Sequence, residues 1–148
     1  MNSIIIEEDN FDKARKKIRE NKGREIIFTS NNDDTARKIL EKEVIDVLLI
    51  KMRNRKDRQK QRNSGLDSVM AKLAKKKNIT IGIDYNEIMN SGGKEKAEIL
   101  SRIKQNVRLC NKEKLKMKFI TNSDERNEYG LKALGLVLGM STAMIKDL

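Results

Sequence analysis

Histidine is absent from this sequence of 148 residues. Without it there are no imidazole metal ligands, no Ser-His or Cys-His nucleophile pairs, and no residue of the type that most often serves as general base. Lysine or glutamate catalysis and carboxylate-only metal sites remain chemically possible, but no clustered carboxylate motif such as an EF-hand loop occurs. We therefore expect no catalytic residue, no metal site and no cofactor bound by the protein itself.

Cysteine, aromatic residues and long apolar runs are also scarce. Cys110 is the only cysteine, which excludes an internal disulfide, and its place in a helical pattern indicates a buried, inert thiol. Three phenylalanines, two tyrosines and no tryptophan leave few platforms on which unpaired bases could stack. The apolar run at residues 4–6 is too short for a signal peptide or a membrane span. We expect a cytoplasmic protein without a membrane partner.

Positive charge is abundant. The sequence has 33 Lys and Arg against 22 Asp and Glu, a formal net charge of +11. This excess is more than solubility requires and favours a polyanionic partner, of which nucleic acid is the most common, although a purely solvating surface is the alternative. A length of 148 residues with 37% hydrophobic content suits a single domain over residues 1–148.

Short β-rich segments alternate with helical periodicity, a pattern typical of βα units around a largely parallel sheet. The expected strands are residues 3–7, 25–29, 46–52, 79–84 and 117–121. Near-continuous apolar runs, as at residues 47–50, indicate strands that are covered on both faces. Right-handed crossovers could wind these units into an open sheet or a barrel, and 148 residues fall short of the roughly 250 of a full (β/α)₈ barrel.

The helices are located by their apolar spacing and their caps. We expect caps at Asn10, at Asp33 or Asp34, and at Ser64, a long helix over residues 94–114 with Arg102, Arg108 and Lys112 largely solvated, and a last helical pattern ending at Gly139. The start at Ser64 resembles a capping box because Asp67 follows three residues later.

A strongly basic segment occupies residues 51–62, with seven basic residues and one acidic residue. It follows an expected strand, so it should lie at the carboxyl edge of the sheet, where α/β folds place their binding loops. Arg and Lys in such a loop would neutralise phosphates without reading bases, and about six contacts would give a log-log salt slope near roughly −4 to −5. The basic run at residues 75–77 could extend this surface or complement a helix dipole.

Four segments, in order, resemble archaeal ribonuclease P protein component 3. They are a loop-helix-strand signature at residues 63–83, then residues 105–112, the polar strand end at residues 121–123, and the closing helix at residues 131–140. The sequence departs from that family by having less chain before the basic loop and by reading Asp-Glu-Arg-Asn-Glu-Tyr at residues 124–129, where the family commonly has an Arg-Pro pair.

The resemblance implies an α/β, TIM-barrel-like (βα)n fold, here a reduced or incomplete barrel. It implies a subunit of ribonuclease P, the ribonucleoprotein endonuclease of tRNA processing, that binds and stabilises the catalytic RNA. On this account the RNA and its Mg²⁺ ions remove the 5′ leader of precursor tRNA. The implied partners are the ribonuclease P RNA, protein component 2, other ribonuclease P proteins and, indirectly, precursor tRNA.

The resemblance also suggests RNA-binding residues. The positions that match the family are Arg53, Arg55, Lys56, Arg58, Arg62, Lys76 and Lys77, and the candidates Lys60, Ser64, Lys72 and Arg108 complete the set. Two alternatives to a ribonuclease P subunit remain. One is a free-standing protein that binds structured nucleic acid, and the other is a barrel-type phosphoesterase, which the absence of histidine opposes.

Overall fold

Five parallel strands form the sheet of this computed structural model, which describes residues 3–57, 62–121 and 128–148. The strands are β1 (Ser3–Glu7), β2 (Glu25–Thr29), β3 (Val47–Ile50), β4 (Thr80–Asp84) and β5 (Met117–Ile120). Each strand pairs in parallel with the next one along the chain, so their order in the sheet is β1-β2-β3-β4-β5. Because every connection advances by one strand, right-handed crossovers place the connecting helices on the same face, as in a (βα) barrel.

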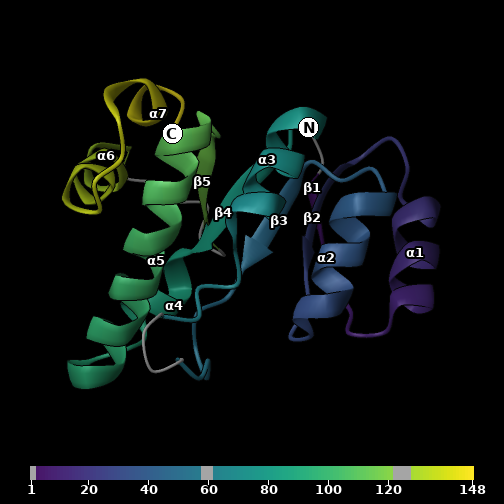
Figure 1. Cartoon of the computed structure of the whole chain (residues 1–148), viewed down its shortest axis with the longest axis horizontal. Coiled ribbons are helices and arrows are strands. Elements are labelled where there is room, and N and C mark those ends of the chain that lie inside the picture. The colour runs from purple at the N-terminus through teal and green to yellow at the C-terminus, as the bar shows by residue number, and fades with distance from the viewer. Residues whose placement is uncertain (1–2, 58–61, 122–127) are drawn as a thin grey trace.

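The helices lie along the sheet from one end to the other (Figure 1). They are α1 (Phe11–Glu20), α2 (Asp33–Lys42), α3 (Ser68–Lys77), α4 (Tyr85–Met89), α5 (Gly93–Glu113), α6 (Glu128–Val137) and α7 (Thr142–Lys146). In the view of Figure 1, α1 and α2 stand at the right-hand end, and α5, α6 and α7 stand at the left-hand end. The long helix and the final helix predicted from the sequence are both present, and α7 adds a short helix after Gly139.

The sheet has two different apolar faces. The large core packs one face against the helices, and a smaller cluster of Ile27, Val47, Leu49 and Ile120 lies on the other face. Gly82 lies within this second cluster, where an added Cβ would come within 3.0 Å of Val47 Cγ1. A side chain at this position would therefore require Val47 and its neighbours to shift.

An ion pair joins strands that are not neighbours in the sheet. Lys118 Nζ on β5 lies 3.2 Å from Glu25 Oε1 on β2. Such a contact between the second and the last strand requires the sheet to curve strongly, with this face inward. Among the described residues β1 and β5 each pair on one side only, so the observed architecture is an open, curved sheet with barrel-type winding.

The predicted strands are all present, and β1 and β2 have the predicted bounds. The strand predicted at residues 46–52 is shorter, because the backbone N–H groups of Met52 and Arg53 donate to the Glu87 carboxylate instead of continuing a ladder. Part of the expected polar strand end, residues 122 and 123, lies outside the described residues.

Two predicted helix caps were wrong by a few residues. The α2 cap is Asn32, whose side-chain oxygen accepts from the backbone N–H groups of Asp34 and Thr35. The α3 cap is Asp67, which accepts from the Met70 N–H over 2.8 Å, and not Ser64. The cap predicted at Asn10 is confirmed, since its side chain accepts from the Lys13 N–H.

Cys110 is fully buried on α5, and burial raises the pKa of its thiol to about 12. The prediction of a buried thiol is confirmed. The helices of residues 3–57, 62–121 and 128–148 include none with the length and apolar character needed to cross a bilayer.

Candidate nucleic-acid interface

The basic segment leaves β3 at the carboxyl edge of the sheet. Its first residues form hydrogen bonds with a side chain of α4. The Glu87 carboxylate accepts the Met52 N–H over 2.8 Å and the Arg53 N–H over 3.1 Å. Burial raises the pKa of Glu87, and these two donors act in the opposite direction by stabilising its anion. The start of the loop therefore has a defined backbone path, fixed in part by a carboxylate from outside the loop.

Arg102 of α5 holds the middle of the loop. The residue is 4% exposed, and its guanidinium donates to the backbone oxygens of Met52 over 2.9 Å and Arg55 over 2.7 Å. It also donates to the Asp57 carboxylate over 3.2 Å. The expectation that Arg102 is solvated was wrong, because the carbonyls and the carboxylate of the loop supply the partners that a buried guanidinium needs.

Asp57, the one acidic residue of the basic segment, connects Arg102 to the residue that follows the segment. Its carboxylate accepts the backbone N–H of Asn63 over 2.8 Å as well as the Arg102 side chain. These two hydrogen bonds, that from Asn63 first, lower the pKa of Asp57. The carboxylate thus ties the end of the loop back to its middle.

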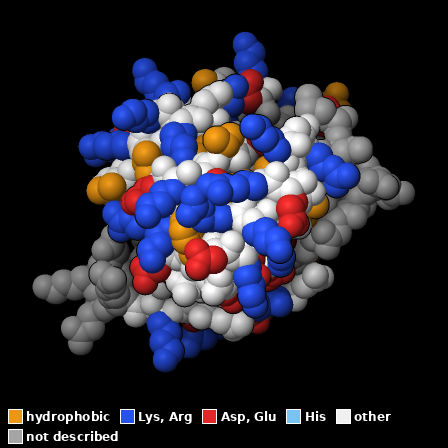
Figure 2. All heavy atoms as spheres, turned by 90° about the vertical axis from the view of Figure 1, so that its right-hand side faces the viewer, with side chains coloured by type: hydrophobic (Ala, Val, Ile, Leu, Met, Phe, Trp, Pro, Cys, Tyr) orange, Lys and Arg blue, Asp and Glu red, His pale blue; other side chains and the backbone are white. Residues whose placement is uncertain are grey.

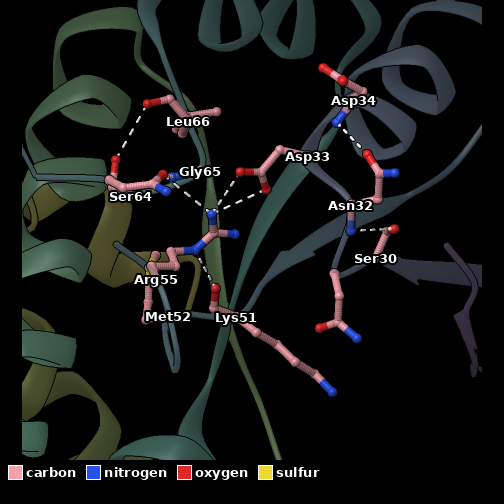
Figure 3. A network of polar contacts seen from close by, with 12 residues as sticks. Ser30, Asn32, Asp33, Asp34, Lys51, Met52, Arg55, Ser64, Gly65 and Leu66 are labelled. Carbon is pink, nitrogen blue, oxygen red and sulfur yellow. Dashed lines mark hydrogen bonds and ion pairs between the residues drawn. The ribbon is translucent and has the colours of Figure 1, made fainter. Parts of the chain in front are cut away.

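Arg55 faces inward although its position matches the family's RNA-binding set. Its Nε donates to the Lys51 carbonyl over 2.7 Å, and its Nη1 donates to Asp33 at 3.0 and 3.1 Å (Figure 3). The side chain is 11% exposed. Its guanidinium also packs on Gly65, whose φ is +74° and where an added Cβ would lie 2.7 Å from Arg55 Nη2. We therefore assign Arg55 to the scaffold of the loop.

Two further candidates form hydrogen bonds within the protein. The Ser64 hydroxyl is buried, donates to the Leu66 carbonyl and accepts from Gln105 over 3.1 Å. Lys77 donates from Nζ to the Leu40 carbonyl over 2.6 Å and to the Glu43 carbonyl over 2.8 Å, and burial lowers its pKa. Each side chain would have to give up these internal hydrogen bonds to bind a phosphate.

The other described candidates point outward. Arg53, Lys56, Arg62, Lys72, Lys76 and Arg108 are all exposed. Arg53 pairs with the exposed Glu95 over 2.7 Å, and Arg62 lies 4.0 Å from Asp57. Exposed pairs of this kind contribute little and exchange readily for another anion. Arg58 and Lys60 lie outside the described residues.

We refer to Arg53, Lys56 and Arg62 as the loop cations. In the described part of the loop, Glu87, Arg102 and Asp57 bind backbone groups of Met52, Arg53, Arg55 and Asn63. Exposed cations on a backbone that is held at these described positions suit the phosphate backbone of a folded nucleic acid, because anchored residues lose less conformational freedom on binding. In the part of the chain that the structure describes, no three His, Cys, Asp or Glu side chains group so as to hold a metal ion.

Sequence reasoning missed Glu87, Asp57 and Arg102, which shape the loop. For Arg102 a signal was present, because Ile99, Arg102, Ile103 and Asn106 follow the spacing of one buried helix face. Glu87 and Asp57 carried no comparable signal, since their roles depend on backbone groups brought near by the fold.

Comparison with known proteins gives a consistent result. Residues 3–146 match the family described as RNase P subunit p30. Ribonuclease P protein component 3 from Methanococcus maripaludis strains C7 and C5 is 26% identical over 132 residues, which is 89% of this chain and 53% of each relative. The chain thus spans about half the length of the curated relatives it matches.

A solved structure has the same fold. A chain in the cryo-EM structure of archaeal ribonuclease P with mature tRNA superposes with a TM-score of 0.78 and 24% identity, over 93% of this chain and 60% of that one. The similarity supports the barrel-type winding of the sheet and agrees with the fold class predicted from the sequence.

Proposed function

We propose, because this chain belongs to the RNase P subunit p30 family, that it acts as a protein subunit of ribonuclease P, binding and stabilising the RNA that removes the 5′ leader from precursor tRNA. The observation that carries the proposal is the exposed set Arg53, Lys56 and Arg62 on a loop whose backbone Arg102 holds at Met52 and Arg55.

On this proposal the protein takes no part in bond breaking. The loop cations neutralise phosphates where strands of the RNA come close together, which lowers the electrostatic cost of the compact, active RNA fold. Mg²⁺ required for cleavage is held by the RNA. The relatives are named as components of ribonuclease P, which supports a multi-subunit assembly; protein component 2 is the proposed direct partner, and the cytoplasm the proposed location.

The test compares cleavage of precursor tRNA by the cognate ribonuclease P RNA with component 2 and either the native chain or a loop variant. In the variant, Arg53, Lys56 and Arg62 are each replaced by Gln. We expect the native chain alone to cleave nothing, and to lower the Mg²⁺ requirement of the RNA when component 2 is present. The loop variant should bind the RNA about tenfold more weakly and lower the magnitude of the salt slope by about 2 to 3.

A matched control distinguishes the effect of the loop positions from the effect of lowering the net charge of the protein. Lys112, Lys116 and Lys146 are exposed, lie outside the candidate set, and can be changed to Gln with the same change in charge. If the loop variant and this control bound the RNA equally well, or the native chain left the Mg²⁺ requirement unchanged, the proposal would be wrong.

A free-standing nucleic-acid binder remains the second candidate because the charge excess alone does not specify a ribozyme. Sequencing the RNA that co-purifies with the tagged protein from its own cell distinguishes the two. One predominant structured RNA supports the subunit, whereas a random pool supports the free-standing binder.

A further inference from the structure

A second concentration of positive charge lies on α1 and α2, outside the basic segment. The outer side of α1 carries Lys13, Lys16 and Lys17, and α2 adds Lys38 and Lys42. Figure 2 views the molecule from this side, with Lys and Arg side chains spread across the face and fewer acidic ones between them. Lys13 and Lys16 are exposed and form no ion pair with any described residue, so their charge is available to a partner.

Three cations on this face converge on one aromatic ring. Arg15 Cζ lies 5.4 Å from the Phe11 ring centroid, Lys42 Nζ lies 5.6 Å away and Lys38 Nζ lies 5.9 Å away. The ring attracts each cation individually, but the cations repel one another. Of the three, Arg15 has a carboxylate partner, Glu43, which it shares with Arg19. The cluster therefore retains a net positive charge that an external anion would neutralise.

The chemistry of the face fits a phosphate backbone better than the apolar centre of a protein interface or a lipid surface. The exposed large hydrophobic residues of the described chain all lie outside α1 and α2, and the apolar sides of these helices, including Ile18 and Leu40, are in the core. The centre of a protein interface is depleted of charge and rich in apolar and aromatic side chains. A helix on a membrane surface needs an apolar side for the lipid. A phosphate backbone needs neither of these.

The face also distinguishes between forms of nucleic acid. Phe11 is half-buried and three cations lie close to its ring, so it is a poor platform on which an unpaired base could stack. Single-strand binding relies on such stacking, whereas double-helical RNA is recognised through its shape and its phosphates.

We infer that Lys13, Arg15, Lys16, Lys38 and Lys42, the α1–α2 cationic face, form a second contact with RNA, on the phosphates of a double-helical segment. The inference rests on the proposed function and extends it. Helices α1 and α2 stand at the β1–β2 end of the molecule, whereas α4 and α5, which hold the basic loop, stand towards the β4–β5 end (Figure 1). One folded RNA bound at both places would gain affinity from the second contact without any change in the first.

The experiment measures binding of the full chain to the ribonuclease P RNA of its own cell at several KCl concentrations. In the test variant Lys13, Lys16, Lys38 and Lys42 are replaced by Gln, which removes charge and keeps helix propensity. In the control variant Lys112, Lys116, Lys132 and Lys146 are replaced by Gln, the same change in net charge on other elements. We expect the test variant to bind at least tenfold more weakly, with a salt slope smaller in magnitude by about 2 to 4, and the control variant to stay within about threefold of the native chain.

A second measurement locates the contact and does not depend on affinity. Because the native Cys110 is fully buried, Lys16→Cys or Lys146→Cys would introduce the one readily labelled thiol, to which an iron chelate can be attached. Hydroxyl radicals produced at position 16 should cut a double-helical region of the bound RNA, and those produced at position 146 should cut that region far less.

The outcomes separate this inference from the proposed function. If the test variant behaves like the control variant, or if the chelate at position 16 cuts no more than the chelate at position 146, the second contact does not exist. The proposed function stands in that case provided that the loop variant still weakens binding. If the native chain does not bind the RNA at all, both ideas fall.

Discussion

The Arg102 guanidinium donates to the Asp57 carboxylate over 3.2 Å, joining a buried position of α5 to the one acidic residue of the basic segment. The same guanidinium donates to two backbone carbonyls of the loop. The conformation of the loop therefore depends on a helix that begins about thirty residues after the loop ends.

Replacing Arg102 by Met should destabilise the protein by about 2 to 4 kcal/mol. The substitution keeps much of the apolar volume but leaves the carbonyls of Met52 and Arg55 without donors in a largely buried setting. Urea unfolding followed by circular dichroism measures the change. Arg108→Met on the same helix is the control, because Arg108 is exposed and its loss should change the free energy of unfolding by less than about 0.5 kcal/mol. Equal effects of the two substitutions would contradict the assigned role.

Acid should weaken the protein partly through Asp57. Hydrogen bonds from Asn63 and Arg102 lower its pKa in the folded state below the ordinary value of 3.8. The unfolded state then binds more protons between the folded pKa and 3.8, so the stabilisation is complete well above 3.8 and is lost as pH falls through the folded pKa. Asp57→Asn should destabilise the protein at pH 6 and have a smaller effect at pH 3.

The measurement for Asp57 is the urea midpoint of both proteins between pH 3 and 6. When Arg102 is also replaced by Met, the difference in urea midpoint between the proteins with Asp and with Asn at position 57 should shrink. One of the two hydrogen bonds that lower the pKa of Asp57 is then gone. A difference that stayed constant across this pH range would show that the carboxylate is not perturbed.

Gly65→Ala should destabilise the protein by at least about 1 to 3 kcal/mol. The residue has a φ of +74°, and an added Cβ would lie 2.7 Å from both Arg55 Nη2 and Ile50 Cγ2. The alanine must displace the Arg55 side chain and disturb its contact with Asp33. Gly92→Ala is the matched control, since the space around Gly92 is open, and it should change the free energy of unfolding by less than about 1 kcal/mol.

Lys76 and Lys77 are adjacent in the sequence, but their substitutions should have different effects. Lys77→Gln removes a charged donor from the Leu40 and Glu43 carbonyls at the end of α2 and should cost about 1 to 2 kcal/mol of stability. Lys76→Gln, at an exposed position, should leave stability nearly unchanged and weaken RNA binding more than Lys77→Gln does. Thermal unfolding and RNA binding, measured on both variants, check the two expectations; the reverse pattern would contradict them.

The fold was predictable from the sequence because its signals are local. Apolar, β-branched runs located every strand, and charge and apolar spacing located most helices. The cap of α3 was misplaced because Ser64 and Asp67 are both good capping residues. The choice between them depends on contacts from α5, where the Gln105 and Asn106 side chains donate to the Ser64 hydroxyl and carbonyl. A pattern of neighbouring residues does not contain that information.

The candidate interface was predictable as a segment but not as a set of side chains. The charge density of residues 51–62 located the loop. Which cations point outward is decided by partners far along the chain, such as Asp33 for Arg55 and the Leu40 carbonyl for Lys77. Arg55 and Lys77 therefore look equivalent to Lys56 and Lys76 in the sequence, although their environments differ.

In the basic loop, the residues that hold the backbone differ from the residues that point outward. This difference affects which substitutions the protein can accept during evolution. Glu87 and Arg102 bind main-chain N–H and C=O groups, which every amino acid except proline supplies, so other substitutions of Arg53, Lys56 or Arg62 leave these hydrogen bonds in place. Because exposed ion pairs contribute little to stability, the outward positions can change along with the RNA at little cost in folding. Substitution of Arg102 differs, because it removes the hydrogen bonds that hold the loop backbone and so disturbs every outward position at once.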